Sequence, residues 1–137
     1  MKSIKGKMIA LGLFGVLMVG CGQDSQKEII SKWNLIALND NGTAISLDSA
    51  EEPVFVTFDG QKINGNAGCN NFFGNYTLKD NTLMVQGVGM TRKMCSEESM
   101  AIEDSLIKVF ADGSSQANIN GAELVIQKEG IKATFKK

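Results

Sequence analysis

The stretch that decides the fold reads Ile63-Asn64-Gly65-Asn66-Ala67-Gly68-Cys69-Asn70-Asn71-Phe72-Phe73-Gly74-Asn75-Tyr76, and it is completed further on by Thr91-Arg92-Lys93-Met94-Cys95. Residues 63–95 hold two of the three cysteines and the only tyrosine of the 137-residue chain. Closely spaced glycines permit backbone conformations that other residues avoid. We therefore expect a tightly turned segment that is held in place, rather than a flexible loop.

On both sides of this stretch, short apolar and β-branched runs alternate with turn dipeptides, a pattern typical of strands joined by hairpins. The expected strands are Trp33–Leu38, Pro53–Phe58, Gln61–Asn64, Tyr76–Leu78, Leu83–Val85, Leu124–Gln127 and Ile131–Lys136. Asp59-Gly60, Asn120-Gly121 and Glu129-Gly130 are expected turns, because such pairs tolerate the positive φ that tight hairpins need. The strict alternation of the last run indicates a sheet with one face in water.

One segment, Ser99–Phe110, departs from this period of two. Its apolar residues recur at i, i+4, i+7 and i+8, which predicts a helix with one core-facing stripe: Ile102, Leu106, Val109 and Phe110. Ser96 or Ser99 can cap its start, and Gly113 is expected to end it in the left-handed conformation. The opposite face, with Glu103, Asp104 and Lys108, is expected to be solvated.

These elements predict an α+β domain, in which a small antiparallel β-barrel-like sheet of about eight strands carries one packed helix. Closure into a barrel leaves no free strand edges. Gly65, Gly68 and Gly74 are expected to supply the bends that closure requires. With so few strands the interior should be filled by side chains, namely Trp33, Val54, Val56, Phe58, Leu83, Val85 and the helix stripe.

The N-terminus reads as a lipoprotein signal peptide over residues 1–20. A lysine-rich start precedes the apolar run Met8–Val19, which is too short to span a bilayer as a helix. Leu17-Met18-Val19-Gly20-Cys21 resembles the lipobox of bacterial lipoproteins, which predicts lipidation of Cys21, a lipidated tether over 21–31 and a folded domain over 32–137. Gly22 implies the outer membrane, with the protein lipid-anchored on its periplasmic face. The alternative is an ordinary secreted protein in which Cys21 occurs by chance.

Cys69 and Cys95 remain as an even pair once Cys21 carries lipid. An oxidising compartment favours a disulfide between them, and the alternative is two buried reduced thiols. No metal and no cofactor are expected, because the chain has no histidine and two cysteines alone make a poor metal site.

Catalysis and nucleic-acid binding are disfavoured by composition. Without histidine the chain has no Ser-His or Cys-His pair, and its adjacent carboxylates show no sign of a shared pocket. Removal of residues 1–20 takes away three lysines from a chain with 14 basic and 15 acidic residues, so the remaining surface is mildly acidic. We expect neither an enzyme nor a nucleic-acid partner.

The motifs Trp33-x-Leu35, Gly65-x-x-Gly68-Cys69-Asn70-x-Phe72-x-Gly74-x-Tyr76 and Gly89-Met90-Thr91-x-x-x-Cys95 resemble the META domain family, in particular the HslJ-type heat shock lipoproteins. The resemblance covers residues 30–137. It implies a small β-barrel-like α+β fold. Family members have been linked to heat induction, to tolerance of antibiotics such as novobiocin, and to motility or secretion. The family supplies no catalytic residue.

Each motif residue has a structural role open to it without any ligand. Asn70 and Thr91 can bond to backbone in turns, and the neighbours Phe72 and Phe73 should point to opposite faces of a strand. Arg92 and Lys93 are expected to be solvated, with contact to lipid headgroups as the weaker reading.

Two hypotheses for function remain. The favoured one is a non-enzymatic envelope stress or assembly module that binds an unidentified protein partner. The alternative is a periplasmic barrel that binds a small apolar ligand.

Overall fold

The structure is a computed structural model that describes Gly15 and residues 24–137. Cys21 and the expected signal peptide other than Gly15 lie outside the described residues. The elements in chain order are α1 (Asp24–Glu28), β1 (Ser31–Asp40), β2 (Thr43–Ile45), β3 (Phe55–Phe58), β4 (Lys62–Asn66), β5 (Asn71–Lys79), β6 (Thr82–Met90), α2 (Glu97–Phe110), β7 (Gly113–Asn120), β8 (Glu123–Lys128) and β9 (Ile131–Lys136). Among the described residues, no helix is both long and apolar enough to cross a membrane.

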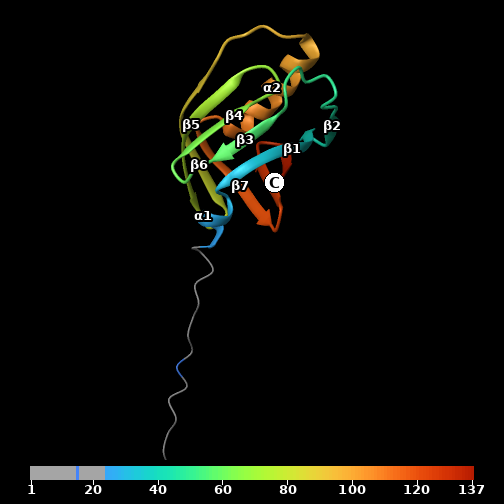
Figure 1. The fold of residues 1–137 in the computed structure, drawn as a ribbon. Coiled ribbons are helices and arrows are strands. Elements are labelled where there is room, and N and C mark those ends of the chain that lie inside the picture. Colours follow the sequence, from blue (N-terminus) through green and yellow to red (C-terminus); the bar gives the residue numbers. More distant parts are fainter. Residues whose placement is uncertain (1–14, 16–23) are drawn as a thin grey trace, which may run out of the picture.

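Eight of the strands close into an antiparallel barrel (Figure 1). Strands β3 to β9 pair in chain order, and β1 pairs with both β3 and β9, which completes the ring. The short β2 lies outside the ring and forms a hairpin with the end of β1. The predicted α+β barrel with one packed helix is therefore confirmed. Three strands, rather than the expected two, follow α2.

Of the three expected turns, Glu129-Gly130 forms as predicted, whereas in Asn120-Gly121 and Asp59-Gly60 only the glycine has positive φ. Both residues of Asn41-Gly42 and of Glu129-Gly130 have positive φ, as two-residue turns of this kind require. At Asp59-Gly60 only the glycine has positive φ, and the connection includes Gln61 as well. The Asp59 carboxylate accepts hydrogen bonds from the backbone N–H groups of Gln61 and Lys62, at 2.8 and 2.6 Å, and so fixes the longer turn.

The barrel interior is filled by side chains. All six strand residues predicted to face inward are buried, as is the α2 stripe, so this prediction is confirmed. Phe110 stacks on Phe72 of β5 with ring centroids 5.0 Å apart and meets Phe135 of β9 edge-on at 6.2 Å. Because β5 and β9 lie on well-separated parts of the ring, α2 holds both walls of the barrel. Burial of each such side chain contributes about 1.5–3 kcal/mol.

The folded part of the chain begins earlier than the expected boundary at residue 32. Helix α1 lies within the segment that was expected to be a tether, and it packs against β5. Ile29 is fully buried, and its carbonyl accepts a 2.8 Å hydrogen bond from Trp33 Nε1. Gln26 Nε2 donates to the Leu78 carbonyl at 2.7 Å. Helix α1 and Ile29 thus belong to the domain.

The start of α2 agrees with one of the two predicted caps, whereas its end does not agree with the prediction. The Ser96 hydroxyl accepts a bond from the Ser99 N–H, so Ser96 is the N-cap. The helix ends at Phe110 because Ala111 is already extended. Gly113 has a φ of 125° but begins β7, so the prediction that it terminates the helix was wrong.

Candidate functional site

The motif cysteines join two loops that are distant in sequence. Cys69 and Cys95 form a disulfide, with sulfur atoms 2.09 Å apart and α-carbons 6.0 Å apart. Cys69 lies between β4 and β5, and Cys95 lies in the segment between β6 and α2, which we call the 91–96 loop. In the structure the two cysteines are therefore joined by a disulfide and are not two reduced thiols.

Asn70 holds the 91–96 loop by bonding to its backbone. Its Oδ1 accepts hydrogen bonds from the Lys93 N–H at 2.5 Å and from the Thr91 hydroxyl at 3.0 Å. Its Nδ2 donates to the Lys93 carbonyl at 3.0 Å. One amide side chain thus bonds both backbone groups of Lys93, as a neighbouring strand would. Thr91 Oγ1 also accepts the Asn71 N–H at 3.0 Å.

Glu103 is part of the same network, which corrects the expectation that it lies on a solvated face. The side chain comes from α2 and is only 4% exposed. Its carboxylate accepts the Asn70 N–H at 2.7 Å and Asn70 Nδ2 at 3.0 Å. A buried carboxylate needs such donors, because an unpaired buried charge is costly. We call Cys69, Asn70, Thr91, Cys95 and Glu103 the clamp.

Gly68 allows the clamp to form. Its φ of 98° is one that other residues rarely adopt. This conformation accompanies a carbonyl that accepts three hydrogen bonds, from the Ser99 hydroxyl at 2.9 Å and from the backbone N–H groups of Glu51 and Glu52 at 3.1 and 3.0 Å. The glycine therefore connects α2 and the segment before β3 to the clamp.

A salt bridge on the surface supports the same loop. Lys93 Nζ lies 2.9 Å from Glu52 Oε1, and Asn66 Nδ2 donates to the other carboxylate oxygen. The hydrogen bond from Lys93, followed by that from Asn66, lowers the pKa of Glu52. The same bond to Glu52 raises the pKa of Lys93. Lys93 is thus paired, a more specific role than the expected solvation.

The other motif residues have roles in packing. Trp33 and Phe72 are buried in the core. A Cβ on Gly65 would lie 2.2 Å from the Phe55 carbonyl oxygen, so only glycine fits there. Gly74 lies where the register between β5 and β6 shifts, as expected of a bend.

Tyr76 links packing to a turn. Its hydroxyl accepts the Gly60 N–H at 2.8 Å, and its ring meets Phe58 edge-on at 4.9 Å. Burial raises the pKa of this phenol. Like the other motif residues outside the clamp, Tyr76 stabilises the barrel.

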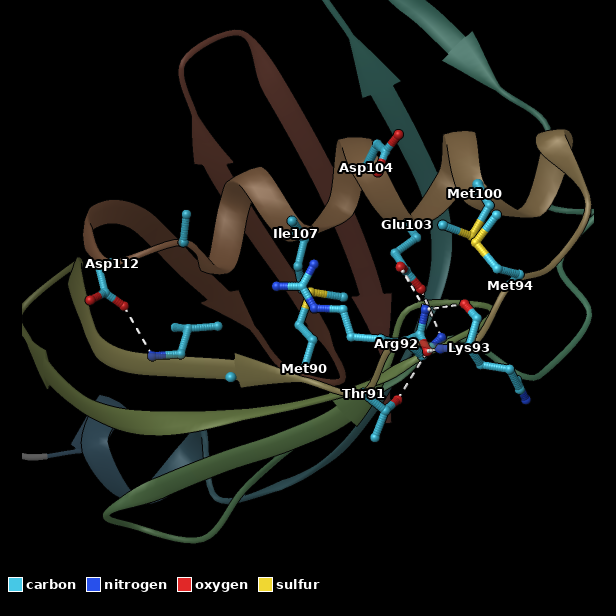
Figure 2. A pocket seen from close by; sticks show the side chains of 14 residues that line it. Met90, Thr91, Arg92, Lys93, Met94, Met100, Glu103, Asp104, Ile107 and Asp112 are labelled. Carbon is cyan, nitrogen blue, oxygen red and sulfur yellow. Dashed lines mark hydrogen bonds between the residues drawn. The ribbon is translucent and has the colours of Figure 1, made fainter.

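A groove of about 580 Å³ lies beside the clamp, outside the barrel interior, between α2, the end of β6 and the 91–96 loop (Figure 2). Its lining comprises Asn70, Val88, Gly89, Met90, Thr91, Arg92, Lys93, Met94, Met100, Glu103, Asp104, Ile107, Ala111 and Asp112. Because the clamp fixes the 91–96 loop, it also fixes one wall of the groove.

The groove combines soft apolar walls with one extended cation. Met90, Met94, Met100 and Ile107 supply flexible thioether and aliphatic surface, a lining that adapts to ligands of varied shape. In Figure 2 the Arg92 side chain lies along the groove past Met90, with its guanidinium below Ile107. This surface can bind an apolar group next to an anion.

Sequence reasoning did not identify the groove, although a partial signal exists. Met100, Glu103 and Ile107 fall at i, i+3 and i+7, which defines a second stripe on α2 beside the core stripe. Met90 belongs to the quoted motif, but its partners come from a distant helix.

Phe72 and Phe73 point to opposite sides of β5, as predicted. Phe72 is 1% exposed and Phe73 is 52% exposed. The Phe73 ring covers Gly89 across the strand pair, at a position where a Cβ would approach the ring to 2.5 Å. The exposed aromatic therefore already packs on a neighbouring strand.

Among the described residues, no group of three His, Cys, Asp or Glu side chains is placed to hold a metal ion.

The fold and site together define a class of small proteins: a closed antiparallel barrel with one helix, in which a disulfide and a buried amide hold the loop between the sixth strand and the helix. The model of the META domain family matches residues 27–137. The chain belongs to the META domain family.

Individual relatives agree with this assignment. Heat shock protein HslJ of Escherichia coli (strain K12) is 22% identical over 134 residues, which cover 95% of this chain and 94% of that protein. An NMR structure of a protein from Burkholderia xenovorans is 23% identical with a TM-score of 0.65, and covers 98% of this chain and 96% of that one. A crystal structure of an uncharacterized protein from Bacteroides eggerthii is 21% identical with a TM-score of 0.50, and covers 79% of this chain and 98% of that one. At these identities the solved structures support the fold alone.

Proposed function

We propose that the protein is a lipoprotein of the outer membrane, anchored through Cys21 on the periplasmic side, which acts by binding a protein partner and not by catalysis. The groove between α2 and β6 is the observation that carries the binding role, because it offers about 580 Å³ of adaptable surface fixed by the clamp. The lipobox-like sequence supports the anchor.

The cellular role that we propose is in envelope stress, with an effect on antibiotic tolerance. The name of the similar protein from Escherichia coli, Heat shock protein HslJ, supports a role under heat stress. A partner-binding module at the outer membrane would stabilise another envelope component when heat unfolds it.

A second candidate function is the binding of a small apolar or amphiphilic ligand. The groove exceeds the roughly 300 Å³ at which small-molecule sites begin, and its walls carry three methionines beside Arg92. The filled barrel interior argues against a ligand enclosed within the ring. The ligand would therefore have to lie in the open groove.

Metabolic labelling with palmitate tests the anchor. Wild-type protein should incorporate label, and Cys21→Ala should lose it and accumulate as the uncleaved precursor. Ser25→Ala, a change in the described N-terminal helix, serves as the matched control and should label normally. Equal labelling of the wild type and Cys21→Ala would remove the lipoprotein assignment.

Growth of a deletion strain tests the cellular role. Loss of the gene should reduce survival after heat shock and in novobiocin, and the wild-type gene should restore both. The Cys21→Ala gene should fail to restore them if the anchor matters.

Lipid extraction of the purified protein separates the two candidate functions, since only the second predicts a stoichiometric apolar compound.

A further inference from the structure

One side of β6 lacks a strand partner along the groove. β5 pairs with β6 from Thr82 to Met90, whereas β7 pairs only from Thr82 to Val85. Beyond Val85, among the residues that the structure describes, no strand pairs with β6 on the side away from β5. Helix α2 runs alongside instead, and the groove lies between the two (Figure 2). The closed barrel therefore keeps one open strand edge.

Hydrogen bonds on either side of this edge show which backbone groups face the groove. The Thr91 N–H donates to the Asn71 carbonyl at 3.0 Å, toward β5. The Val88 N–H donates to Asp112 Oδ1 at 3.1 Å, on the side of α2. Because successive N–H groups along a strand alternate in direction, the backbone N–H and carbonyl of Met90 point into the groove.

The same edge has only part of the usual protection against strand addition. Exposed edges are commonly blocked by proline, by charged side chains, by a β-bulge or by a covering segment, and of these β6 has a bulge between Gln86 and Gly89. Residues 86–90 contain neither proline nor lysine, and Asp112 occupies only the N–H of Val88. An edge and a helix that flank an apolar groove form the arrangement by which several domains bind extended peptides.

The charge in the groove indicates what such a peptide carries. Lys93 is paired with Glu52, whereas Arg92 has no carboxylate within salt-bridge distance among the described residues. Three acidic residues also line the groove: Glu103 and Asp112 accept hydrogen bonds from Asn70 and Val88, and Asp104 points away from Arg92 in Figure 2. A carboxylate on the ligand would therefore complement Arg92.

We propose that the groove binds an extended segment of a partner protein, which adds to the β6 edge as a further strand and places a carboxylate on Arg92. The backbone of the segment pairs with Met90, and its apolar side chains lie against Met90, Met100 and Ile107. This inference rests on the proposed function, of which it specifies the partner. The methionines that line the groove can accommodate different apolar residues of the peptide. The preference of the groove for one peptide over another is therefore set by the backbone pairing and by the carboxylate.

Peptide selection provides the test. The mature protein, purified in the form in which the cell processes it, is used to select from a display library of random segments of about six residues, the length of a common strand. Selected peptides should alternate apolar and polar residues and should carry Asp, Glu or a free carboxyl terminus. In NMR spectra the Met90 amide should shift and become protected from exchange, while the Val88 amide, already bonded, should change less.

Methylated peptides test the backbone pairing without any change to the protein. A selected peptide is made with N-methyl groups on one alternate set of residues and then on the other. One set should abolish binding and the other should retain it, because only alternate N–H groups face the edge.

A charge substitution tests the carboxylate contact. Arg92→Gln should weaken binding about tenfold, the effect of losing one hydrogen bond to a charged group. Lys132→Gln, at an exposed position of β9, removes the same charge elsewhere and should leave binding unchanged.

Four results would overturn the inference: no enrichment of any peptide, equal binding of both methylated peptides, peptide-induced shifts confined to residues outside the groove, or a small amphiphile that fills the groove and excludes peptides. Palmitate labelling of Arg92→Gln is measured in parallel. Normal labelling with lost peptide binding separates this inference from the anchor proposal.

Discussion

Two junctions of the barrel are closed in different ways. Where β1 meets β9, strand pairing runs from Asn34 to Asp40 with one bulge. Where β6 approaches β7, pairing stops after Val85, and the 91–96 loop and α2 continue alongside. The first junction is held by strand pairing along its length, whereas at the second the pairing covers only Thr82–Val85 and the clamp holds the loop that follows β6.

This difference explains where the part of the family motif that forms the clamp lies. Backbone pairing can be made by almost any sequence, so the β1–β9 junction requires few particular residues beyond its core-facing ones. The β6–α2 junction depends on one amide, one buried carboxylate and one disulfide at fixed positions. Specific side chains are needed at the point where the pairing of β6 with β7 ends, and the groove lies beside that point.

The largest expected effect comes from a change in α2 that affects both walls of the barrel. Phe110→Ala should lower the free energy of unfolding by about 3–5 kcal/mol, because the ring packs against both Phe72 and Phe135 and its loss leaves a cavity. Urea unfolding of the variant and of the wild type measures this loss of free energy. Phe73→Ala, at a half-exposed ring, is the matched control and should cost far less. Similar losses for both variants would refute the role of α2 in holding both walls.

Removal of the disulfide should affect the clamped junction first. The bond closes a sequence separation of 26 residues, for which chain entropy predicts a loss of about 3.5 kcal/mol. In the Cys69→Ala/Cys95→Ala variant, amide exchange in the 91–96 loop should accelerate well before exchange in β1 and β9 changes. Uniform acceleration across the barrel would contradict the distinction between the junctions.

Asn70→Ala should cost about 2 kcal/mol, since the backbone groups of Lys93 lose their partner and the Glu103 carboxylate loses the side-chain donor while it keeps the backbone N–H of residue 70. The disulfide remains in this variant, so the measurement separates the amide from the covalent bond. Asn118→Ala on the exposed face of β7 is the control. An unchanged exchange rate at the Lys93 amide would show that Asn70 does not hold the loop.

Acid should weaken the salt bridge that supports the loop. The pKa of Glu52 is lowered by its bond to Lys93, so its contribution to stability is present above the ordinary value of 4.5 and is lost as pH falls through the lowered value. Glu52→Gln should therefore be slightly less stable than wild type at pH 7 and equal to it in strong acid. Glu123→Gln on β8 should differ little from wild type at either pH. A stability gap for Glu52→Gln that persists in acid would argue against this pair.

Much of the fold could be predicted from local sequence patterns. The alternation of apolar and polar residues in the strands and the apolar stripe of α2 indicate directly which side chains are buried. Trp33, Val56 and Phe135 occupy the interior that their spacing indicates. Ile29 was not expected in the core because it follows a polar run without any period. The β2 strand is three residues long and carries no pattern of its own.

The clamp could be predicted only in part. The two cysteines and Asn70 were identifiable from the motif, whereas Glu103 was assigned to the solvated face because a charged residue off the apolar stripe usually lies there. Its partner, Asn70, is distant in the sequence and approaches only in the folded chain. The groove was missed for the same reason, since its walls come from β6 and α2.

Closure through β1 and β9 has a consequence for the order of folding. Most strands pair with a neighbour in sequence, and such local contacts form quickly. The β1–β9 contact joins Asp40 to Ile131 and Asn34 to Lys136, so it must await the synthesis of β9. Until then two strand edges remain unpaired. The chain is thus kept from completing its barrel while β9 is still being made.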